Sequence, residues 1–471
     1  MTKRIVILFL ITGLIFGFAF IVLTPPMTVP DELTHFAKAY GGAEGRFFPK
    51  QISPHNMEQE NLIAPREWGG NVPVEILDLY DVVAFNFGSY HNKYPWEFLS
   101  FSQNSGEQIF TSWGAMAVYP PFAYTPQITG IAIGKLFGAS PLMLFYIARL
   151  FNLLAYLAVC GLALRIFPFP KWAAILISLN PMALFLAGSV SGDAFFLAVS
   201  FLFTTMVFRL AVWNESESLA KNRRLKEMII LCPLLVLLVL MKPLMCIFVL
   251  LFWLIPKTNI SVPHKVLWSG VSIVASISTY FTWQTRMPSM DEVYKIFGIP
   301  SEQIWMLMHH PGIFIRAFLK NLILGVDGDQ IVTGTVAYLG TLDAPIGFHW
   351  ILLYYGLFFI AALYISGRTI FLGNIFQRFI ITPLAIILYV IAIFLTLYIV
   401  WNPPGATAIL GVQGRYFIPL FLLALPPFWG QKVRLNISEK NIGRLVFSGS
   451  IIILLVAVYT ITQRYSLPFV G

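Results

Sequence analysis

The sequence predicts an all-α polytopic membrane protein with about eleven transmembrane helices. Of its 471 residues, 58% are hydrophobic and 11% are charged, and the mean hydropathy is +0.76. Soluble chains carry about 25% charged residues, so this composition excludes a water-soluble globule. Apolar stretches recur at lengths of about 20 residues, as helices that cross a bilayer require. The net charge of +9 is explained by cationic cytoplasmic loops, so we expect no nucleic-acid partner.

The expected elements divide the chain into two parts. Residues 1–430 form a transmembrane module with a large first outer loop, 24–140, that contains interfacial helices, and a second outer loop, 285–345. Residues 431–471 form a basic cytoplasmic loop and the last span. The first run, Ile5 to Leu23, follows Lys3-Arg4 and lacks a small-residue cleavage site, so we expect a retained helix. The predicted spans are 5–23, 141–164, 172–188, 192–213, 228–241, 243–255, 266–284, 346–366, 379–400, 415–430 and 445–463.

Charge patterning predicts the orientation of these spans. Residues 24–120 hold eleven Asp or Glu against five Lys or Arg, whereas the short loops KNRRLK at 221–226 and QKVRLNISEKNIGR at 431–444 are basic. Cationic short loops remain in the cytoplasm. We therefore expect an integral protein of the cytoplasmic membrane with its N-terminus inside, its C-terminus outside and its site facing outward.

The apolar run 228–255 allows two topologies. As one span it would place eight downstream Lys and Arg residues on the outer side. As a hairpin broken at Lys242-Pro243, each arm would have about 13 residues, or roughly 20 Å of α-helix, which is short for a core of about 30 Å. The charge argument favours the hairpin, with Lys242 at the outer face.

An acidic pair, Asp31-Glu32, follows the first span within PDELTHF. Pro25-Pro26 and Pro30 stiffen the approach, because proline restricts its own backbone and that of its predecessor. In a helix that begins here, Asp31 and His35 share one face. A rigid carboxylate at the membrane surface suits a general base whose substrate is anchored in the bilayer. The alternative is a solvated polar collar without chemistry.

Five stretches together resemble a family of bacterial multi-pass membrane proteins, catalogued as a domain of unknown function, that groups with GT-C-fold glycosyltransferases. They are PDELTHF after the first span, YPPFAYTPQITGIAIGKLFG at 119–138, NPMALFLAGSVSGDA at 180–194, the Lys242-Pro243 break and GVQGRYFIP at 411–419. The resemblance covers about residues 24 to 430. It implies a GT-C-like fold that transfers a sugar from a polyprenyl-phosphate donor to an envelope polysaccharide or glycolipid acceptor. Asp31, with Glu32 beside it, matches the family's catalytic acidic position.

The resemblance leaves the metal requirement open. Many relatives of the wider fold have Asp-x-Asp where this chain has one adjacent pair, which is a poor cage for an octahedral ion. We predict no required cofactor and no metal-binding residues, with a divalent metal as the alternative.

The function itself has two alternatives. The protein could be a flippase for lipid-linked sugars, or a non-catalytic partner in cell-envelope assembly.

A departing lipid phosphate would need cations, and charged residues in spans are costly and often functional. We predict donor-phosphate binding by Arg415, Lys242 and Arg149. A snorkelling side chain or a buried ion pair is the alternative for Arg149, and an interfacial anchor is the alternative for Lys242. Residues predicted to contact substrate are His35, Asp193, Gln413, Tyr416 and Tyr119; for Asp193 a helix N-cap is the alternative.

Overall fold

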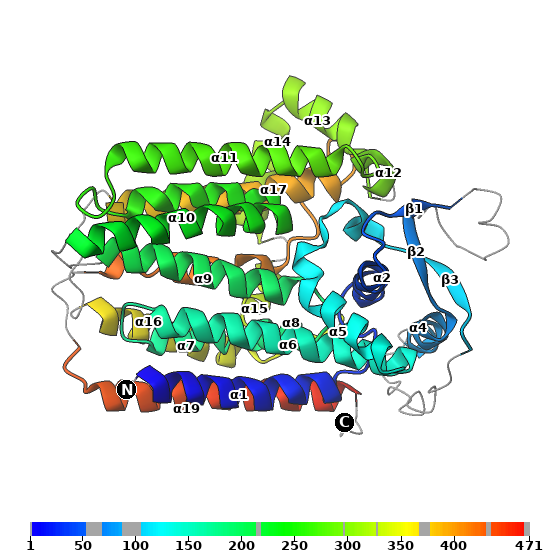
Figure 1. The fold of residues 1–471 in the computed structure, drawn as a ribbon, viewed down its shortest axis with the longest axis horizontal. Helices are drawn as coiled ribbons and strands as arrows, with labels where there is room; N and C mark the ends of the chain where they lie inside the picture. The colour runs from blue at the N-terminus through cyan, green and yellow to red at the C-terminus, as the bar shows by residue number, and fades with distance from the viewer. Residues whose placement is uncertain are drawn as a thin grey trace.

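Long apolar helices lie side by side in this computed structural model, which describes residues 2–52, 68–86, 105–212, 218–294, 297–325, 328–366, 377–429 and 435–465. The helices run along the long axis of the molecule, and the N-terminus lies at the opposite end from the end of the last helix, α19 (Figure 1). The long helices are α1 (Thr2–Leu23), α6 (Pro141–Ile166), α9 (Asp193–Val212), α10 (Ser218–Met241), α11 (Val262–Gln284), α16 (Phe348–Ser366), α17 (Thr382–Val400) and α19 (Glu439–Tyr465).

Seven helices in the described part of the chain are long and apolar enough to cross a membrane. They are α1, α6, α9, α11, α16, α17 with the turn η5 (Gln377–Ile381) before it, and α19. This confirms a polytopic helical architecture, whereas the total of about eleven spans stays a prediction.

Two predicted spans are broken in the structure. Residues 172–188 form α7 (Trp172–Ser178) and α8 (Pro181–Ala187), because Asn180 caps α8 through the Ala183 N–H and Pro181 begins it. Residues 415–430 form η6 (Gly414–Phe417), α18 (Leu420–Leu423) and η7 (Pro426–Phe428), with prolines at the breaks. The expectation of continuous helices here is therefore wrong.

The hairpin at Lys242-Pro243 is confirmed. After α10 ends, η4 (Pro243–Leu254) packs against it and returns to the end of the bundle where α10 begins. There Asn259 donates to Leu210 O at the end of α9 (2.7 Å), and Arg224 Nη1 donates to Asn259 Oδ1 (3.3 Å). The return arm is a 3₁₀ helix, whose rise of about 2.0 Å per residue makes 12 residues longer than they would be as an α-helix.

The segment that the sequence predicts as the first outer loop, which we call the first outer segment, forms a layer of mixed structure at one end of the bundle. Helix α2 (Glu32–Ala43) packs there with β1 (Lys50–Gln51), β2 (Trp68–Pro73) and β3 (Gln108–Ser112), which form an antiparallel sheet in the order β1-β2-β3. Helix α4 (Val74–Asn86) follows β2, and η2 (Gly114–Val118), η3 (Pro121–Tyr124) and α5 (Thr125–Leu136) lead to α6. The sheet was not predicted from the sequence. The predicted loop also includes 53–67 and 87–104, which lie outside the described residues.

The segment predicted as the second outer loop, which we call the second outer segment, begins at the same end with α12 (Figure 1). It consists of α12 (Met290–Tyr294), α13 (Pro300–His309), α14 (Gly312–Leu324), α15 (Gly328–Gly334) and a two-stranded ladder of β4 (Tyr338–Leu339) and β5 (Ala344–Pro345). Helices α13 and α14 pack on α17, and α15 packs on η6. The second outer segment therefore reaches the backbone of Gly414 and Arg415.

Close backbone contact between α15 and η6 requires glycine at Gly414, since an added Cβ would lie 2.1 Å from Ile331 O and 2.4 Å from the carbonyl carbon of Gly334. We predict that Gly414→Ala destabilises the protein by about 1–3 kcal/mol, because backbone atoms cannot yield as side chains do. Unfolding midpoints in detergent test this prediction. The matched control is Gly356→Ala on the exposed face of α16, where a Cβ meets nothing within 4 Å and stability should be unchanged or higher. Equal effects of both substitutions would contradict the packing argument.

Candidate functional site

Three charged side chains meet at the outer-segment end of the bundle. Asp193 is the first residue of α9, Lys242 lies at the hairpin tip, and Arg415 lies in η6. The Asp193 carboxylate is 2.7 Å from Lys242 Nζ through Oδ1 and 3.5 Å from Arg415 Nε through Oδ2. The side chains of Lys242 and Asp193 are 25% and 18% exposed, so a ligand can reach this cluster. The structure thus brings together two of the predicted phosphate-binding residues with Asp193.

A small pocket is lined in part by Arg415. Its lining consists of Met182, Gln330, Gly334, Tyr338, Leu342, Gln413, Gly414 and Arg415. Within the described ranges, Gln413 Oε1 and Arg415 Nε are buried and have no hydrogen-bond partner. A buried polar atom left unpaired costs about 1–3 kcal/mol, so Gln413 Oε1 favours a polar ligand or water here, whereas Arg415 Nε already faces the Asp193 carboxylate at 3.5 Å.

Aromatic side chains surround the charged cluster. Lys242 Nζ lies 4.9 Å from the ring centroid of Phe196 and 5.2 Å from that of Tyr416. The Tyr416 carbonyl accepts a hydrogen bond from Tyr389 (3.2 Å). Burial raises the pKa of Tyr119 to about 12, against the opposing effect of its hydrogen bond with Tyr294, so Tyr119 is a neutral hydroxyl at physiological pH. The predicted Tyr119 and Tyr416 therefore belong to the same neighbourhood as the cations.

The first turn of α2 brings Asp31 and His35 to this neighbourhood. His35 Nδ1 and the Tyr124 hydroxyl are 2.6 Å apart. Burial lowers the pKa of His35 to about 4, and the negative charges of Asp31 and Asp193 oppose that shift only in part. His35 is therefore neutral at physiological pH, and it is near enough to both carboxylates to sense their charge.

Asp31 itself is exposed and holds an unusual backbone conformation. Its φ of 59° places it in the left-handed region, and its side chain makes no capping hydrogen bond to α2. Non-glycine residues in such conformations carry strain and are concentrated at functional sites. The Asp31 carboxylate is thus held at the edge of the site and is open to solvent.

Lys38 and Tyr124 were not singled out from the sequence. The buried Lys38 ammonium donates to Met116 O (2.6 Å) and Tyr119 O (2.5 Å), and it therefore fixes the segment that carries Tyr119. The signals that could have found these residues were a lysine inside an otherwise apolar helical segment and the tyrosine of the YPPFAYTPQ stretch.

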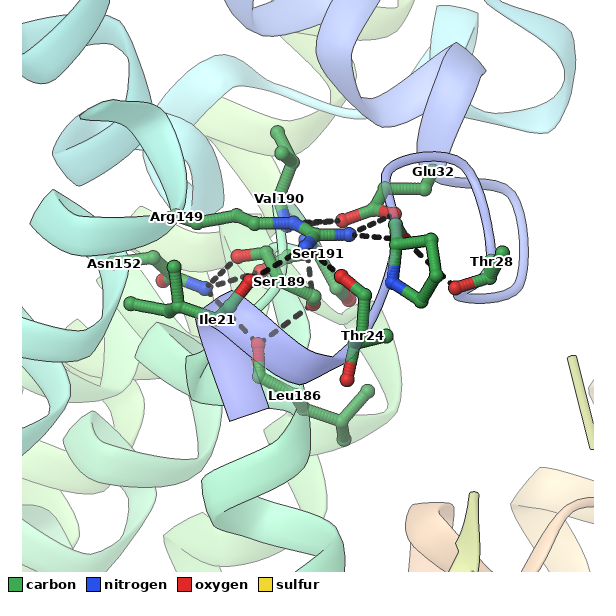
Figure 2. A network of polar contacts seen from close by, with 11 residues as sticks. Ile21, Thr24, Thr28, Glu32, Arg149, Asn152, Leu186, Ser189, Val190 and Ser191 are labelled. Atoms are coloured by element: carbon green, nitrogen blue, oxygen red, sulfur yellow. Dashed lines mark hydrogen bonds and ion pairs between the residues drawn. The ribbon is translucent and has the colours of Figure 1, made fainter. Parts of the chain in front are cut away.

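Glu32 and Arg149 have a different role from the predicted one. Arg149 donates through Nε and Nη2 to the two Glu32 oxygens (2.9 and 2.8 Å). Its remaining N–H groups donate to the carbonyls of Ile21, Thr24 and Pro25 (Figure 2). All five guanidinium donors are thus used, and neither side chain is exposed. This geometry does not support phosphate binding by Arg149 or catalysis by Glu32, and it confirms the alternative of a buried ion pair.

The same network holds the loop that precedes Asp193. Glu32 Oε1 also accepts the Val190 N–H (3.1 Å), and Asn152 Nδ2 lies within hydrogen-bonding distance of the carbonyls of Leu186, Ser189 and Ser191 (Figure 2). Gln127 Nε2 contacts two carbonyls of this loop from α5. Residues 186–191 are therefore fixed from three helices, and with them the start of α9.

The acidic pair does not form a metal cage in this structure. Glu32 is held by Arg149, so Asp31 and Glu32 cannot ligate one ion together. Across the residues that the structure describes, no three His, Cys, Asp or Glu side chains group in a way that could hold a metal ion.

Comparison with protein families identifies the chain. The model of the family described as "Predicted membrane protein (DUF2142)" matches residues 14–424. The chain therefore belongs to this family of predicted membrane proteins. No curated protein and no solved structure matches the chain.

We predict that Arg149→Met destabilises the protein by about 3–5 kcal/mol, because it leaves the Glu32 carboxylate buried without its partner. Unfolding of the purified protein in detergent, followed by intrinsic fluorescence, measures the effect. The double variant Glu32→Met/Arg149→Met should be less destabilised than Arg149→Met alone. A single variant as stable as wild type would contradict the structural role of the pair.

We predict that acidification from pH 6.5 to pH 4 destabilises the protein through His35. In this window the unfolded histidine binds a proton and the folded one does not, so stability is lost as pH falls. A pKa difference from 6.5 to about 4 corresponds to about 3 kcal/mol. The variant His35→Gln should show a smaller decrease in stability over this pH range. Identical pH profiles for the two proteins would show that the pKa of His35 is the same in the folded and unfolded states, and would contradict the prediction.

Proposed function

We propose that this protein is a glycosyltransferase of the cytoplasmic membrane. It transfers a sugar from a polyprenyl-phosphate donor to an envelope polysaccharide or glycolipid acceptor at the outer face, and its fold is GT-C-like. The observation that carries the proposal is the pair of cations, Lys242 and Arg415, at the end of an apolar bundle and close to the exposed carboxylate Asp31. A cation pair suits a lipid phosphate, and a nearby base suits an acceptor hydroxyl.

The distribution of charge supports the outward orientation. Basic residues gather at the end of the helices opposite to the site, where α1 begins and α9 ends. Cationic short loops remain in the cytoplasm, so the site faces outward. The residues at this end are Lys3, Arg4, Arg165, Arg209, Arg224, Lys257, Lys265 and Arg378.

The proposed reaction needs one base and one stabilised leaving group. The Asp31 carboxylate takes the proton of the acceptor hydroxyl, and the hydroxyl oxygen forms a bond to the anomeric carbon of the donor sugar. The bond from that carbon to the phosphate oxygen breaks, and its electron pair stays on the polyprenyl phosphate. Lys242 and Arg415 stabilise the charge that develops there.

The other residues position these groups. Asp193 holds both cations in place and offsets their mutual repulsion while no phosphate is bound. His35 and Tyr124 form a neutral hydrogen-bonded pair beside Asp31, suited to binding sugar hydroxyls. Tyr119, Tyr416 and Gln413 line the approach, where aromatic faces and amide groups recognise sugars by stacking and hydrogen bonding.

One observation favours a second function, the movement of lipid-linked sugars across the membrane. Broken helices inside a bundle are common in transporters, and here α7 and α8 are interrupted at Asn180-Pro181 and residues 414–428 form three short pieces. The charged cluster nevertheless lies at one end of α9 and α10, where an enzyme that takes its substrate from one leaflet would need it.

We predict that purified protein in lipid nanodiscs transfers sugar from at least one member of a panel of polyprenyl-phosphate sugars. Asp31→Asn should lower the rate by at least about 10²-fold, since it removes the base. Arg415→Met and Lys242→Met should each lower it as well, by weakening the stabilisation of the leaving phosphate. Release of polyprenyl phosphate and glycosylation of the acceptor are measured together.

The control for these variants is Lys50→Gln, which removes an exposed cation from β1 in the outer layer. It should keep the wild-type rate. Full activity of Asp31→Asn would contradict the role of the base. If the wild-type protein transfers no sugar but moves the labelled donor across a vesicle membrane, the transporter function replaces the enzyme.

A further inference from the structure

Helices α13 and α14 expose an apolar surface that the proposed reaction does not use. On α13 the exposed apolar side chains are Ile304, Trp305 and Met308, and Met308 is 70% exposed. On α14 they are Ile315, Leu319, Leu322 and Ile323, and Ile323 is 76% exposed. We call these seven residues the α13–α14 face. A group of neighbouring exposed apolar side chains is typical of a surface that a partner or a membrane covers.

Polar anchors fix the opposite side of both helices. The fully buried Gln303 donates to Tyr398 O (3.1 Å) and accepts the Gly405 N–H (2.8 Å). In the same way, Asn321 donates to Ile409 O (2.7 Å) and accepts the Ile409 N–H (2.9 Å). The α13–α14 face therefore points away from the protein because the inner sides are held by hydrogen bonds.

Helix α14 lies against a membrane span. The ring of Phe314 is 5.6 Å from that of Tyr398, and the ring of Phe318 is 5.1 Å from that of Phe394. These two pairs show that α14 runs antiparallel to the last turns of α17. Helix α17 exposes Leu384, Ile387 and Leu388 nearer its other end, so the α13–α14 face continues the exposed apolar side of a candidate span.

The charged residues beside the α13–α14 face indicate what covers it. At helical spacing, Ile315, Leu319 and Leu322 occupy one stripe of α14, and Arg316 and Lys320 lie together along its edge. Both cations are exposed, and neither forms an ion pair within the described part of the chain. An apolar stripe with a cationic edge is typical of helices that lie in the interface of a membrane with anionic lipids.

We propose that the α13–α14 face lies in the outer leaflet of the membrane, with its apolar side chains among acyl chains and with Arg316 and Lys320 on the phosphates of anionic phospholipids. The proposal rests on the outward orientation proposed above, but it does not depend on the transfer reaction, since bulk lipid is the partner. It accounts for Trp305 at the surface, because tryptophan is enriched at membrane interfaces. The connection from α14 through α15 reaches Gly414, so the leaflet borders the segment that holds Arg415.

Spin labels measure the environment of the face directly. Single cysteines replace Leu319 and Ile323 in the full chain after Cys160, Cys232 and Cys246 are changed to alanine. Labelled protein in nanodiscs of phosphatidylcholine and phosphatidylglycerol is exposed to oxygen and to a water-soluble nickel chelate. Val274→Cys on the exposed face of α11 is the lipid control, and Tyr80→Cys on α4 is the water control.

We expect the labels at positions 319 and 323 to behave as at position 274, with nickel accessibility several-fold lower than at position 80. Nickel accessibility equal to that at position 80 would overturn the proposal. Shielding that appears only after a polyprenyl phosphate is added would assign the face to the donor lipid instead. Broadening that grows with the number of chains in a nanodisc would assign it to a second copy. Either result also overturns the proposal.

The charge component has its own test. Spin-labelled phosphatidylglycerol should associate with the wild-type protein more than spin-labelled phosphatidylcholine does, and the double variant Arg316→Gln/Lys320→Gln should reduce this preference. Lys50→Gln on β1 is the matched control and should leave the preference unchanged. An unchanged preference in the double variant would show that these cations do not bind the lipid headgroups.

Discussion

The buried Arg149–Glu32 pair is the interaction on which the rest of the site depends. It joins the end of α1, the start of α2 and the loop before α9, which are far apart in the sequence. Two charges removed from water cost several kcal/mol each, and only the two-pronged geometry and the additional carbonyl partners offset that cost. The pair therefore holds these three elements together. Asp31 directly precedes Glu32, and Asp193 follows the loop that Glu32 holds, so the pair also positions both carboxylates.

The cluster of Asp193, Lys242 and Arg415 is more accessible than the Arg149–Glu32 pair. We therefore assign a structural role to the pair and a chemical role to the cluster. Every donor of Arg149 has a protein partner, whereas Arg415 has a buried Nε without a hydrogen bond and Lys242 is a quarter exposed. A cation whose donors are all used by the protein cannot stabilise a new anion, but Lys242 and Arg415, which share one partly exposed carboxylate, can exchange partners. In our account the Arg149–Glu32 pair fixes the positions of the site residues, and Lys242 and Arg415 provide the positive charge that binds the phosphate. The lipid substrate enters from the adjacent leaflet.

The sequence predicted much of the fold, because hydrophobic length and loop charge are direct consequences of the bilayer. The first span, the hairpin at Lys242-Pro243 and the approach of Asp193, Lys242 and Arg415 to one end all followed from it. The sheet was missed since its strands have two, six and five residues, too few for a clear alternating pattern. The different roles of Asp31 and Glu32 could not be predicted. Adjacent residues point in different directions on a helix, and only the fold shows which of the two contacts Arg149.

The most direct test of the central claim is a cryo-electron microscopy structure of the protein in nanodiscs with a polyprenyl phosphate bound. The account predicts density for the phosphate between Lys242 and Arg415, with Arg149 and Glu32 still paired and unchanged. Phosphate density elsewhere, or at Arg149 with the Glu32 pair broken, would contradict the account. The same map would show whether the lipid chain leaves the site toward the membrane.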